Sequence, residues 1–500
     1  MKQGKLKPII KPGHNVWRVE RASKARLLVD AACYYHWIRE AMEAAERRIF
    51  IVGWDFDTRI PLDPKKGKEK LGAFFLRITK AKPELQIDVL KWNFGALKQF
   101  MKPAAVGWLW KWWRRPNIDF RFDSSHPFGC SHHQKIVVID NCLAVCGGID
   151  IADKRWDTDE HRDSDPDRKS PDGKPYMPWH DATMMMAGDV AQALEELGRE
   201  RWKVATNQQL DEIPPCDGEW PERLDADFED VDIAIARTRA PYEKSPDEKI
   251  SEIREIETLY LDMIAAARDF IYFENQYFTS GKIAAAIAER MKEKTPPEIV
   301  LVMPRTADGW LEQKAMDGAR LKLVAAIGEH DNGAEHRFRV YVPVTKGGED
   351  IYVHAKVSVV DDRFLRVGSS NLNNRSQGLD SECDVIIDAA LPTNKDTPKT
   401  IMSLRHKLIA EHLGVTAEAY AKAEKTEGSM IAAIEALRGK GKTLDLLDLE
   451  DMGAAEDFIA SNEVLDPECV DDMLDPISQG SLAKSWAIGK QRVNSWRGRK

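Results

Sequence analysis

Two stretches of the chain share the same order of apolar and polar positions. Residues 44–51 and residues 265–272 each predict the end of an Ala-rich helix, then a charged pair, then an apolar run with the character of a strand. The second stretch follows the first by 221 residues. The same spacing separates residues 133–140 (HQKIVVID) from residues 354–361 (HAKVSVVD). The pattern therefore predicts an internal repeat with a large, constant offset.

A third match extends the repeat. Gly147-Gly148-Ile149-Asp150 aligns with Gly368-Ser369-Ser370-Asn371, again 221 residues apart. We therefore expect two related halves, residues 1–235 and residues 236–415. Residues 211–222 are rich in proline and acids, which suits an exposed connection between them.

Helical and strand-like segments alternate within each half, so we expect an α/β fold with a mostly buried mixed β-sheet flanked by helices. The remaining residues, 416–500, are first Ala- and Leu-rich, then acid-rich, and they end basic. We expect an acidic helical tail there, either solvated or lying over the second half as a lid. Partner docking or export is the alternative role for this tail.

Composition and charge narrow the class of protein. The 500 residues are 43% hydrophobic and carry 73 Lys and Arg against 82 Asp and Glu, a net charge of −9. An acidic chain does not grip nucleic acid through a global basic field. No apolar run reaches the length of a signal-peptide core or a membrane helix. We expect a soluble protein, cytoplasmic or secreted by a non-classical route, that acts at membrane surfaces from the water side.

The seven cysteines are scattered and odd in number, which argues against a disulfide framework. We interpret them as buried or incidental thiols. Cys142 and Cys146 lack a second pair at the spacing of a zinc site. The acidic run around Asp163 also fails as a calcium loop, because its sixth position is Arg168 instead of glycine and its twelfth is Lys174 instead of glutamate.

The motif His-x-Lys occurs in equivalent places of both halves, as His133 with Lys135 and as His354 with Lys356. In an extended chain the positions i and i+2 project to one side, about 6.6 Å apart. That side can hold one phosphate, because an imidazole can attack or protonate it while an ammonium neutralises its oxygens. Two copies in equivalent places of a repeat are far from a chance match.

Each motif ends in an aspartate, Asp140 or Asp361, where the apolar run leaves the core. These carboxylates belong to the catalytic motif. We nevertheless expect them to be structural, bonding turn amides or a basic partner, rather than to take part in the chemistry.

With these motifs the sequence resembles the phospholipase D superfamily and, within it, the eukaryotic-type phospholipases D. The two histidine motifs resemble its paired HxKxxxxD signature, and residues 368–376 resemble the GSxN segment that follows. Further segments typical of the subgroup have counterparts in residues 147–151, 155–158, 178–181 and 271–278. The resemblance spans about residues 45–385. It implies two phospholipase D-like halves related by a pseudo-twofold axis, with one active site between them.

The resemblance also implies a two-step displacement through a phosphohistidine, with no metal or other cofactor required. We expect His133 to be the nucleophile and His354 the acid/base, and the symmetry leaves the reverse assignment open. The phosphate oxygens would be bound by Lys135, Lys356, Asn371 and, at the position matching Asn371, Asp150.

A nucleophilic imidazole needs its other nitrogen held, usually by a carboxylate. The resemblance gives this role in the second half to Glu382, twenty-eight residues after His354. The same spacing after His133 reaches His161, which is not an acid, and Asp157 is the nearest alternative, so the group that orients His133 stays open. Other orienting or substrate contacts that the resemblance implies are Asp157, His161, Glu274, Asn275, Gln276 and Ser369.

Four of the 15 tryptophans fall within residues 108–115, together with Lys111, Arg114 and Arg115. Indole rings mixed with cations are typical of a lipid interface. The alternative is an amphipathic helix packed over the sheet. The candidates for membrane contact are Trp110, Trp112 and Trp113.

The leading hypothesis is a phospholipase D that hydrolyses phosphatidylcholine-like lipids to phosphatidate and free alcohol, with transfer to other alcohols through the same intermediate. Its partners would be a phospholipid in a membrane surface and water or an alcohol as acceptor, without nucleic acid, and one complete site per chain suits a monomer. The alternatives are a cardiolipin-synthase-like phosphatidyltransferase and a nuclease or other phosphodiesterase. A non-catalytic membrane-binding scaffold should have lost motif residues, and both copies are intact.

Overall fold

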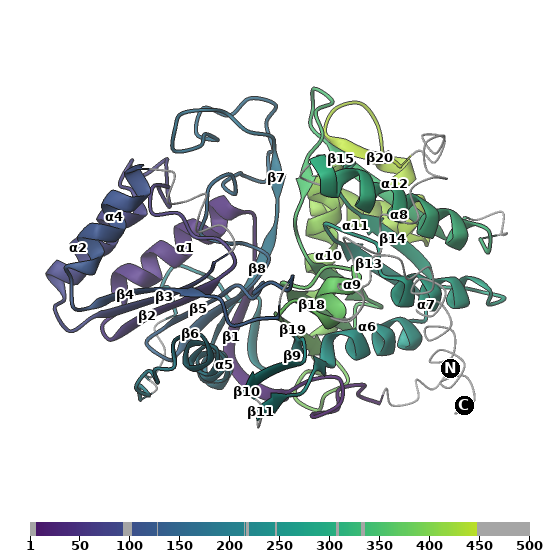
Figure 1. The fold of residues 1–500 in the computed structure, drawn as a ribbon. Helices are drawn as coiled ribbons and strands as arrows, with labels where there is room; N and C mark the ends of the chain where they lie inside the picture. Colours follow the sequence, from purple (N-terminus) through teal and green to yellow (C-terminus); the bar gives the residue numbers. More distant parts are fainter. Residues whose placement is uncertain are drawn as a thin grey trace.

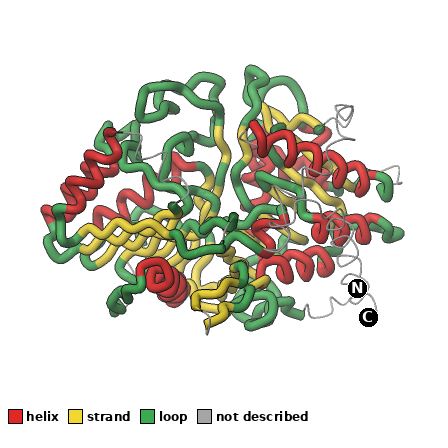
Figure 2. Tube along the Cα trace, viewed as in Figure 1, coloured by secondary structure: helices red, strands yellow, loops and turns green. Residues whose placement is uncertain are grey.

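One mixed sheet of sixteen strands runs through the molecule, with helices on both of its faces (Figures 1 and 2). The structure is a computed structural model that describes residues 7–93, 103–127, 129–214, 216, 220–245, 248–306, 310–331 and 336–447. The α/β class expected from the alternating pattern is confirmed.

The first half contributes the strands on one side of this sheet. The strands of this half are β1 (Arg18–Val29), β2 (Arg48–Gly53), β3 (Gln86–Trp92), β4 (Ile118–Asp123), β5 (Ile136–Ile139), β6 (Leu143–Gly147), β7 (Trp179–His180) and β8 (Ala182–Ala187), and all of them except β7 belong to the large sheet. Its helices are α1 (Ala31–Ala44), α2 (Leu71–Ala81), α4 (Pro103–Trp113) and α5 (Asp189–Thr206).

The second half repeats this order. Its strands are β9 (Phe228–Arg239), β10 (Tyr242–Ser245), β11 (Glu248–Ile250), β12 (Ile253–Arg254), β13 (Phe270–Glu274), β14 (Glu298–Val302), β15 (Phe338–Val344), β16 (Tyr352–Val353), β17 (Val357–Val360), β18 (Phe364–Gly368) and β19 (Glu382–Asp388). Its helices are α6 (Glu255–Ala266), α7 (Gly281–Met291), α8 (Trp310–Gly328), α9 (Asn374–Gly378) and α10 (Pro398–Leu413).

The strand order makes the repeat visible in space. From β15 at one side it reads β15-β14-β13-β17-β18-β19-β9 and then β1-β8-β6-β5-β2-β3-β4, so the two halves run in mirrored order. They join where β9 pairs antiparallel with β1, from Arg18 opposite Ile235 to Ala25 opposite Phe228. Because β9 is the counterpart of β1, the boundary expected at residue 235 falls inside the first strand of the second half.

Helices cover both faces of the central strands, which explains why every residue of β5 and of β17 is buried. One core cluster crosses from half to half. It contains Val190 and Leu194 of α5 together with Leu404 and Leu408 of α10. The halves therefore share a core as well as the β1–β9 ladder, so side chains of both can meet in fixed positions.

The β5–β6 and β17–β18 hairpins turn on the aspartates that end the two histidine motifs. Asp140 and Asn141 have φ of 50° and 57°, and Asp361 and Asp362 have φ of 54° and 48°. Two successive residues with positive φ form the backbone of a type I′ turn, whose twist matches that of the flanking strands. Asp and Asn are the residues besides glycine that enter this region most readily.

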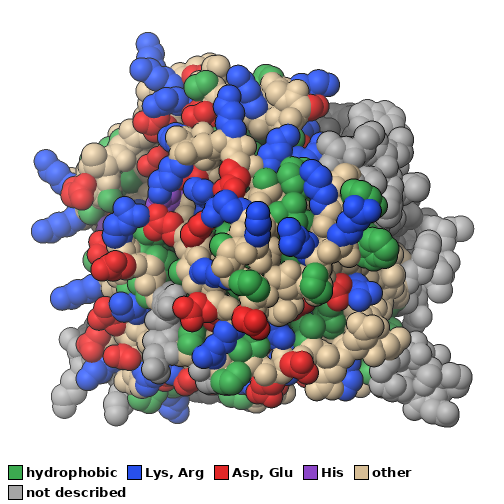
Figure 3. Space-filling view, turned by 90° about the vertical axis from the view of Figure 1, so that its left-hand side faces the viewer, with side chains coloured by type: hydrophobic (Ala, Val, Ile, Leu, Met, Phe, Trp, Pro, Cys, Tyr) green, Lys and Arg blue, Asp and Glu red, His purple; other side chains and the backbone are tan. Residues whose placement is uncertain are grey.

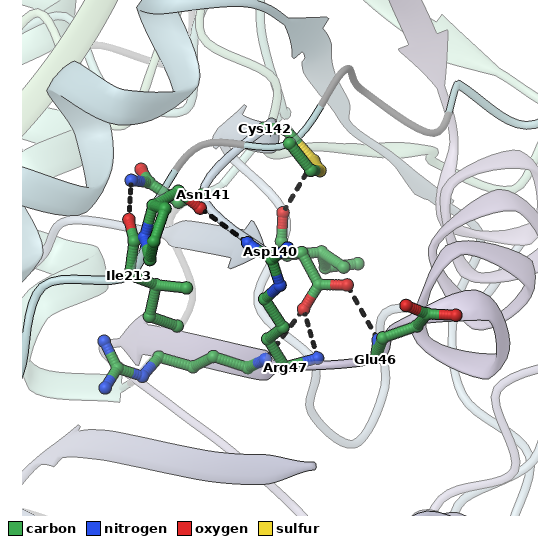
Figure 4. Close-up of a disulfide and its surroundings, with 10 residues drawn as sticks. Glu46, Arg47, Asp140, Asn141, Cys142 and Ile213 are labelled. Atoms are coloured by element: carbon green, nitrogen blue, oxygen red, sulfur yellow. Dashed lines mark hydrogen bonds between the residues drawn. A yellow bond between two sulfur atoms is a disulfide. The ribbon is translucent and has the colours of Figure 1, made fainter. Parts of the chain in front are cut away.

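The carboxylates of these turns bind backbone amides. Asp140 accepts hydrogen bonds from the amides of residues 46–48, at 2.7 and 2.8 Å (Figure 4). Asp361 accepts the equivalent bonds from residues 268–270, at 2.7 and 2.9 Å. Each aspartate thus fixes the chain entering the neighbouring strand, which is a structural role rather than a chemical one.

The expectation that all cysteines are incidental thiols is wrong for one pair. Cys142, beside the β5–β6 turn, forms a disulfide with Cys216 in the connection between the halves (Figure 4). The side chain of Asn141 adds a hydrogen bond to the carbonyl oxygen of Ile213 at 2.6 Å. The connection is therefore attached to the first half at two neighbouring points. Spacing along the chain does not reveal this pair, because the two cysteines are 74 residues apart.

The tail packs on the second half as far as it is described. It forms α11 (Ala417–Glu427), α12 (Met430–Leu437) and β20 (Thr443–Leu446), and β20 joins the sheet antiparallel to β15. The rest of the expected tail, residues 448–500, lies outside the described residues. Within the described part of the chain, no helix combines the length and the apolarity that a bilayer crossing requires.

Candidate active site

The two His-x-Lys motifs lie where the halves meet, immediately before β5 and β17. The backbone amide of His133 donates to the carbonyl oxygen of Ser381 at 2.9 Å, and the amide of His354 donates to that of His180 at 2.7 Å. Each motif is therefore held by a backbone group of the opposite half. This crossing places both histidines at the boundary between the two copies.

Each of these imidazoles is also held at Nδ1 by a carboxylate of the opposite half. The Nδ1 of His133 lies 3.0 Å from both carboxylate oxygens of Glu382. The Nδ1 of His354 lies 2.6 Å from Oδ2 of Asp181. A carboxylate at Nδ1 selects the tautomer that leaves the Nε2 lone pair for chemistry, and it stabilises the imidazolium.

This pairing differs from the sequence prediction. Glu382 holds His133, not the histidine of its own half, and neither Asp157 nor His161 orients His133. Asp181 was missed as a site residue although it lies in the segment 178–181 that resembles the family. The open question of what orients His133 is answered by a residue from the other copy.

Asp181 and Glu382 are equivalent residues of the repeat. Each comes directly before a buried run, residues 182–187 or 383–387, that pairs with the hairpin of its motif. Thr183 pairs with Gly147, 36 residues earlier, whereas Asp384 pairs with Gly368, only 16 residues earlier. The constant 221-residue spacing fails here because of this longer segment in the first half. An acid followed by an apolar run was the signal that could have identified Asp181.

Burial and neighbouring cations lower the pKa of both imidazoles well below the usual value. For His133 burial has the largest effect, followed by Lys135 and Lys356. For His354 the order is burial, Lys356 and Arg155, with Lys135 also contributing. Both histidines are therefore neutral at neutral pH, which is the form a nucleophile needs. Lysines of both halves act on each imidazole, so the four side chains form one electrostatic site.

The groups around the histidines are shifted as well. Burial raises the pKa of Glu382 to about 8, although hydrogen bonds from the hydroxyls of Ser369 and Ser376 favour its ionised form. Burial also raises the pKa of Asp181. It lowers the pKa of Lys356 to about 7. A phosphate anion between the lysines would favour the charged forms of lysine and imidazole. It would therefore raise the pKa values of Lys356, His133 and His354 again.

The residues expected to form the phosphate cradle have different surroundings. The carboxylate of Asp150 lies 3.1 Å from Nζ of Lys135 and accepts the amides of Trp54 and Asp55. It therefore positions the lysine, and its negative charge does not suit a phosphate contact. Asn371 is buried, and its Oδ1 has no hydrogen-bond partner among the described residues.

Three other predicted residues, Gln276, Asn275 and Ser369, support the site. Gln276 accepts a hydrogen bond at its Oε1 from Lys356 at 3.2 Å. Asn275 accepts the amide of Leu372 at 3.0 Å, which fixes the loop that carries Asn371. Ser369 donates to Glu382, as described above. The remaining candidates, Asp157, His161 and Glu274, belong to a separate buried cluster around His180.

Two tryptophans that were not singled out from the sequence flank the histidines. The ring of Trp54 lies edge-on to His133, with centroids 6.1 Å apart, and stacks on Trp92. The ring of Trp179 lies 5.2 Å from His354 and stacks on Tyr352. These rings shield the imidazoles from water on one side, which contributes to the burial that lowers their pKa values.

The tryptophan-rich helix α4 divides between core and surface. Trp112 is buried, stacks on Phe75 and donates to the carbonyl oxygen of Gly72, so its assignment as a membrane contact is wrong. Trp110 is 52% exposed and Trp113 is 82% exposed, and the guanidinium of Arg114 covers the ring of Trp110. Figure 3 views the side of the molecule on which α2 and α4 lie in Figure 1, where Lys and Arg side chains are mixed with apolar ones.

The His-x-Lys motifs of the two α/β copies meet at one boundary, and a carboxylate of the other copy completes each motif. This arrangement defines a class of protein in which two halves share a single histidine site. The chain belongs to the phospholipase D superfamily, in its eukaryotic-type subgroup. Residues 41–303 match the family model described as phospholipase D. Residues 260–401 match the model described as cardiolipin synthase, PLD-like domain.

Individual relatives agree with this assignment. The chain is 25% identical to phospholipase D1 of Saccharomyces cerevisiae over 79% of its length, and 25% identical to phospholipase D alpha 1 of Nicotiana tabacum over 78%. It spans 29% of the yeast relative and 65% of the tobacco relative. The fold is similar to that of phosphatidylserine synthase from Haemophilus influenzae, with a TM-score of 0.54 at 12% identity, covering 95% of this chain and 98% of that one.

Proposed function

We propose that the protein is a phospholipase D that hydrolyses the terminal phosphodiester of phosphatidylcholine-like lipids to phosphatidate and free alcohol. The observation that carries this proposal is the crossed pairing of His133 with Glu382 and of His354 with Asp181. This pairing leaves Nε2 of both imidazoles available for the reaction, beside two lysines that attract one phosphate.

In the first step, Nε2 of His133 attacks phosphorus, and the bond from phosphorus to the headgroup oxygen breaks. His354, protonated as the anionic substrate raises its pKa, gives its Nε2 proton to the leaving oxygen. In the second step His354 takes a proton from water, which attacks the phosphohistidine and breaks its P–N bond. Phosphatidate leaves, and His133 returns to its starting state. Proton transfers of this kind contribute about 10²- to 10⁴-fold to the rate.

No metal or other cofactor is assigned to this reaction, because the two imidazoles and the two lysines supply the nucleophile, the acid and the neutralising charge. The complete set of groups comes from one chain, which suits a monomer. Trp110 and Trp113 of α4, with Arg114 directly after the helix, are the proposed contact with the lipid surface.

A second candidate is a phosphatidyltransferase that uses the same phosphohistidine but an alcohol as acceptor. The match of residues 260–401 to a cardiolipin synthase-like model favours it. Hydrolysis and transfer differ only in what attacks the intermediate. A nuclease is the less favoured alternative, since the chain is acidic overall.

The test incubates the protein with vesicles carrying choline or ethanolamine headgroups and, separately, with DNA. We expect release of headgroup alcohol from vesicles, and added ethanol should divert part of the product to phosphatidylethanol. DNA cleavage without headgroup release would overturn the lipid assignment. Phosphatidyl transfer to an alcohol without measurable hydrolysis would select the second candidate.

Two variants test the shared site. His133→Ala and His354→Ala should each abolish turnover, because one chain contains only one site of this kind in its described residues. His36→Ala removes a partly buried imidazole on α1 near Asp63, and as the matched control it should keep full activity. Turnover retained by either site variant would refute the two-histidine mechanism.

A further inference from the structure

A buried cluster of histidines and carboxylates lies next to the active site and takes no part in the proposed reaction. It contains Asp30, His161, His180 and Glu411, and one ligand atom from each lies within 4.8 Å of all the others. The first three belong to the first half, and Glu411 belongs to α10 of the second half. Only Glu411 is more than marginally exposed, at 13% of its side chain.

The four short imidazole–carboxylate distances within the cluster fit hydrogen bonds and also fit the ligand spacing of a metal site. Oε1 of Glu411 lies 3.2 Å from Nε2 of His161 and 3.0 Å from Nδ1 of His180. The carboxylate of Asp30 lies 3.5 Å from the same nitrogen of His161 and 3.3 Å from that of His180. With metal–ligand distances of about 2.0–2.1 Å, neighbouring ligand atoms of a tetrahedral zinc site are about 3.3–3.4 Å apart.

The opposite nitrogen of each imidazole is held by a further carboxylate. Nδ1 of His161 lies 3.0 Å from Oδ2 of Asp157, and Nε2 of His180 lies 3.0 Å from Oε2 of Glu274. With a proton on each of these outer nitrogens, both inner nitrogens would offer their lone pairs to a bound cation in place of their hydrogen bonds to Glu411. Metal-binding histidines almost always have this arrangement, in which an outer carboxylate fixes the tautomer and the ring orientation.

Asp30 provides an independent observation. Its residue is 1% exposed, and its Oδ2 makes no hydrogen bond within the described residues. Asp30 occupies the N-cap position of α1, where aspartate usually caps, yet its side chain accepts no capping bond there. A buried carboxylate oxygen without a hydrogen bond is costly, and a cation would compensate its charge.

We propose that Asp30, His161, His180 and Glu411 bind one divalent transition-metal ion, best fitted by Zn²⁺ in tetrahedral coordination. Two carboxylates neutralise its charge and two neutral imidazoles complete the ligand set. The neighbouring group of His180, Glu274 and His412 is the weaker alternative. It has three ligands, and Glu274 is already bonded by His180, His412 and the hydroxyl of Tyr272.

Such an ion would join the two halves beside the active site. Its ligands come from both, and His180 directly precedes Asp181, the carboxylate on His354. The ion would thus act as a structural link that positions this carboxylate, at a distance from the phosphate chemistry. The cluster would bind the ion whether the chain acts as a hydrolase or as a transferase.

The test measures metal content directly. We would purify the protein without a polyhistidine tag, dialyse it against Zn²⁺ and then against metal-free buffer, and determine the metal by mass spectrometry. We expect about one equivalent of Zn²⁺ per chain in the wild type and in the active-site variant His133→Ala. The variants Asp30→Asn and His161→Gln should lose it, whereas the control His36→Gln should retain it.

Two further measurements keep the test decisive if a variant folds poorly. Wild-type protein stripped with a chelator should unfold at a lower temperature and recover on adding Zn²⁺. Loading with Co²⁺ should give the strong visible absorption bands of four-coordinate cobalt. Wild-type protein that binds no zinc, or ion retained in both folded ligand variants, would overturn the proposal. Loss of lipid hydrolysis by His133→Ala with full metal content separates this site from the catalytic one.

Discussion

Replacing Asp181 by Asn tests the crossed pairing of histidines and carboxylates most directly. Oδ2 of Asp181 lies 2.6 Å from Nδ1 of His354, and the residue is buried. When His354 is an imidazolium, this charge pair is worth about 6 kcal/mol at an effective dielectric constant of about 20. An amide keeps part of a hydrogen bond but not the charge, so we expect a loss of about 3–6 kcal/mol. That corresponds to a fall in kcat of roughly 10²- to 10⁴-fold.

The assay separates positioning of the acid from general damage. Release of choline from vesicles needs a proton from His354, whereas p-nitrophenol leaves without one. In Asp181→Asn the first burst of p-nitrophenol from a p-nitrophenyl phosphodiester should therefore slow far less than choline release. Asp227→Asn removes a carboxylate that accepts one backbone amide, that of Leu27, away from the site, and it should leave both rates unchanged. Equal losses on both substrates, or a fall below threefold, would refute the reasoning.

Four other substitutions have expected outcomes. Burial lowers the pKa of Lys356 to about 7, so kcat/KM should fall as the pH rises above 7 and this ammonium loses its proton. In Lys356→Arg the side chain stays charged, so this fall should disappear from the pH profile. Cys142→Ser should lower the free energy of unfolding by roughly 2–4 kcal/mol in urea titrations without reductant, because the disulfide closes a long loop. Trp113→Ala should weaken vesicle binding about tenfold in sedimentation assays and spare soluble substrate, whereas Trp112→Ala should cost roughly 3–5 kcal/mol of stability.

Each of the first three has an outcome that would contradict it. A basic limb that persists in Lys356→Arg would assign it to another group, such as Glu382. Wild-type protein whose urea midpoint does not change on adding reductant would argue against the disulfide, with Cys33→Ser as the thiol control. Unchanged vesicle binding by Trp113→Ala would remove α4 from the proposed lipid contact.

Most of the fold was predictable because its signals are local. Helix and strand periodicities, and the aspartates that end the two histidine motifs, repeat at a constant spacing, so two α/β halves could be inferred without coordinates. The histidine and lysine positions followed from the same repeat. The histidine and lysine of each motif occupy neighbouring positions in one extended segment. Their pattern can therefore be recognised from the sequence alone.

The partners of those residues were not predictable in the same way. Glu382 was expected beside the histidine of its own half and instead holds His133, and Asp181 was not selected at all. The longer segment between β6 and β8 displaces Asp181 from the spacing of the repeat. Trp112 illustrates a further limit, because one face of a tryptophan-rich helix packs into the core while the other stays exposed.

The amino-acid sequence by itself determined the two halves, their buried strands and the two His-x-Lys motifs, since these depend on residues close together in the chain. The tertiary structure alone decided which carboxylate meets which imidazole, that Cys142 meets Cys216, and that Asp30 and Glu411 face the same two histidines. The carboxylate–imidazole contacts form where the two halves meet, whereas the disulfide joins the first half to the connection that follows it. All of these contacts join segments that lie 74 or more residues apart in the chain, so they depend on how the whole chain packs, which no local pattern encodes.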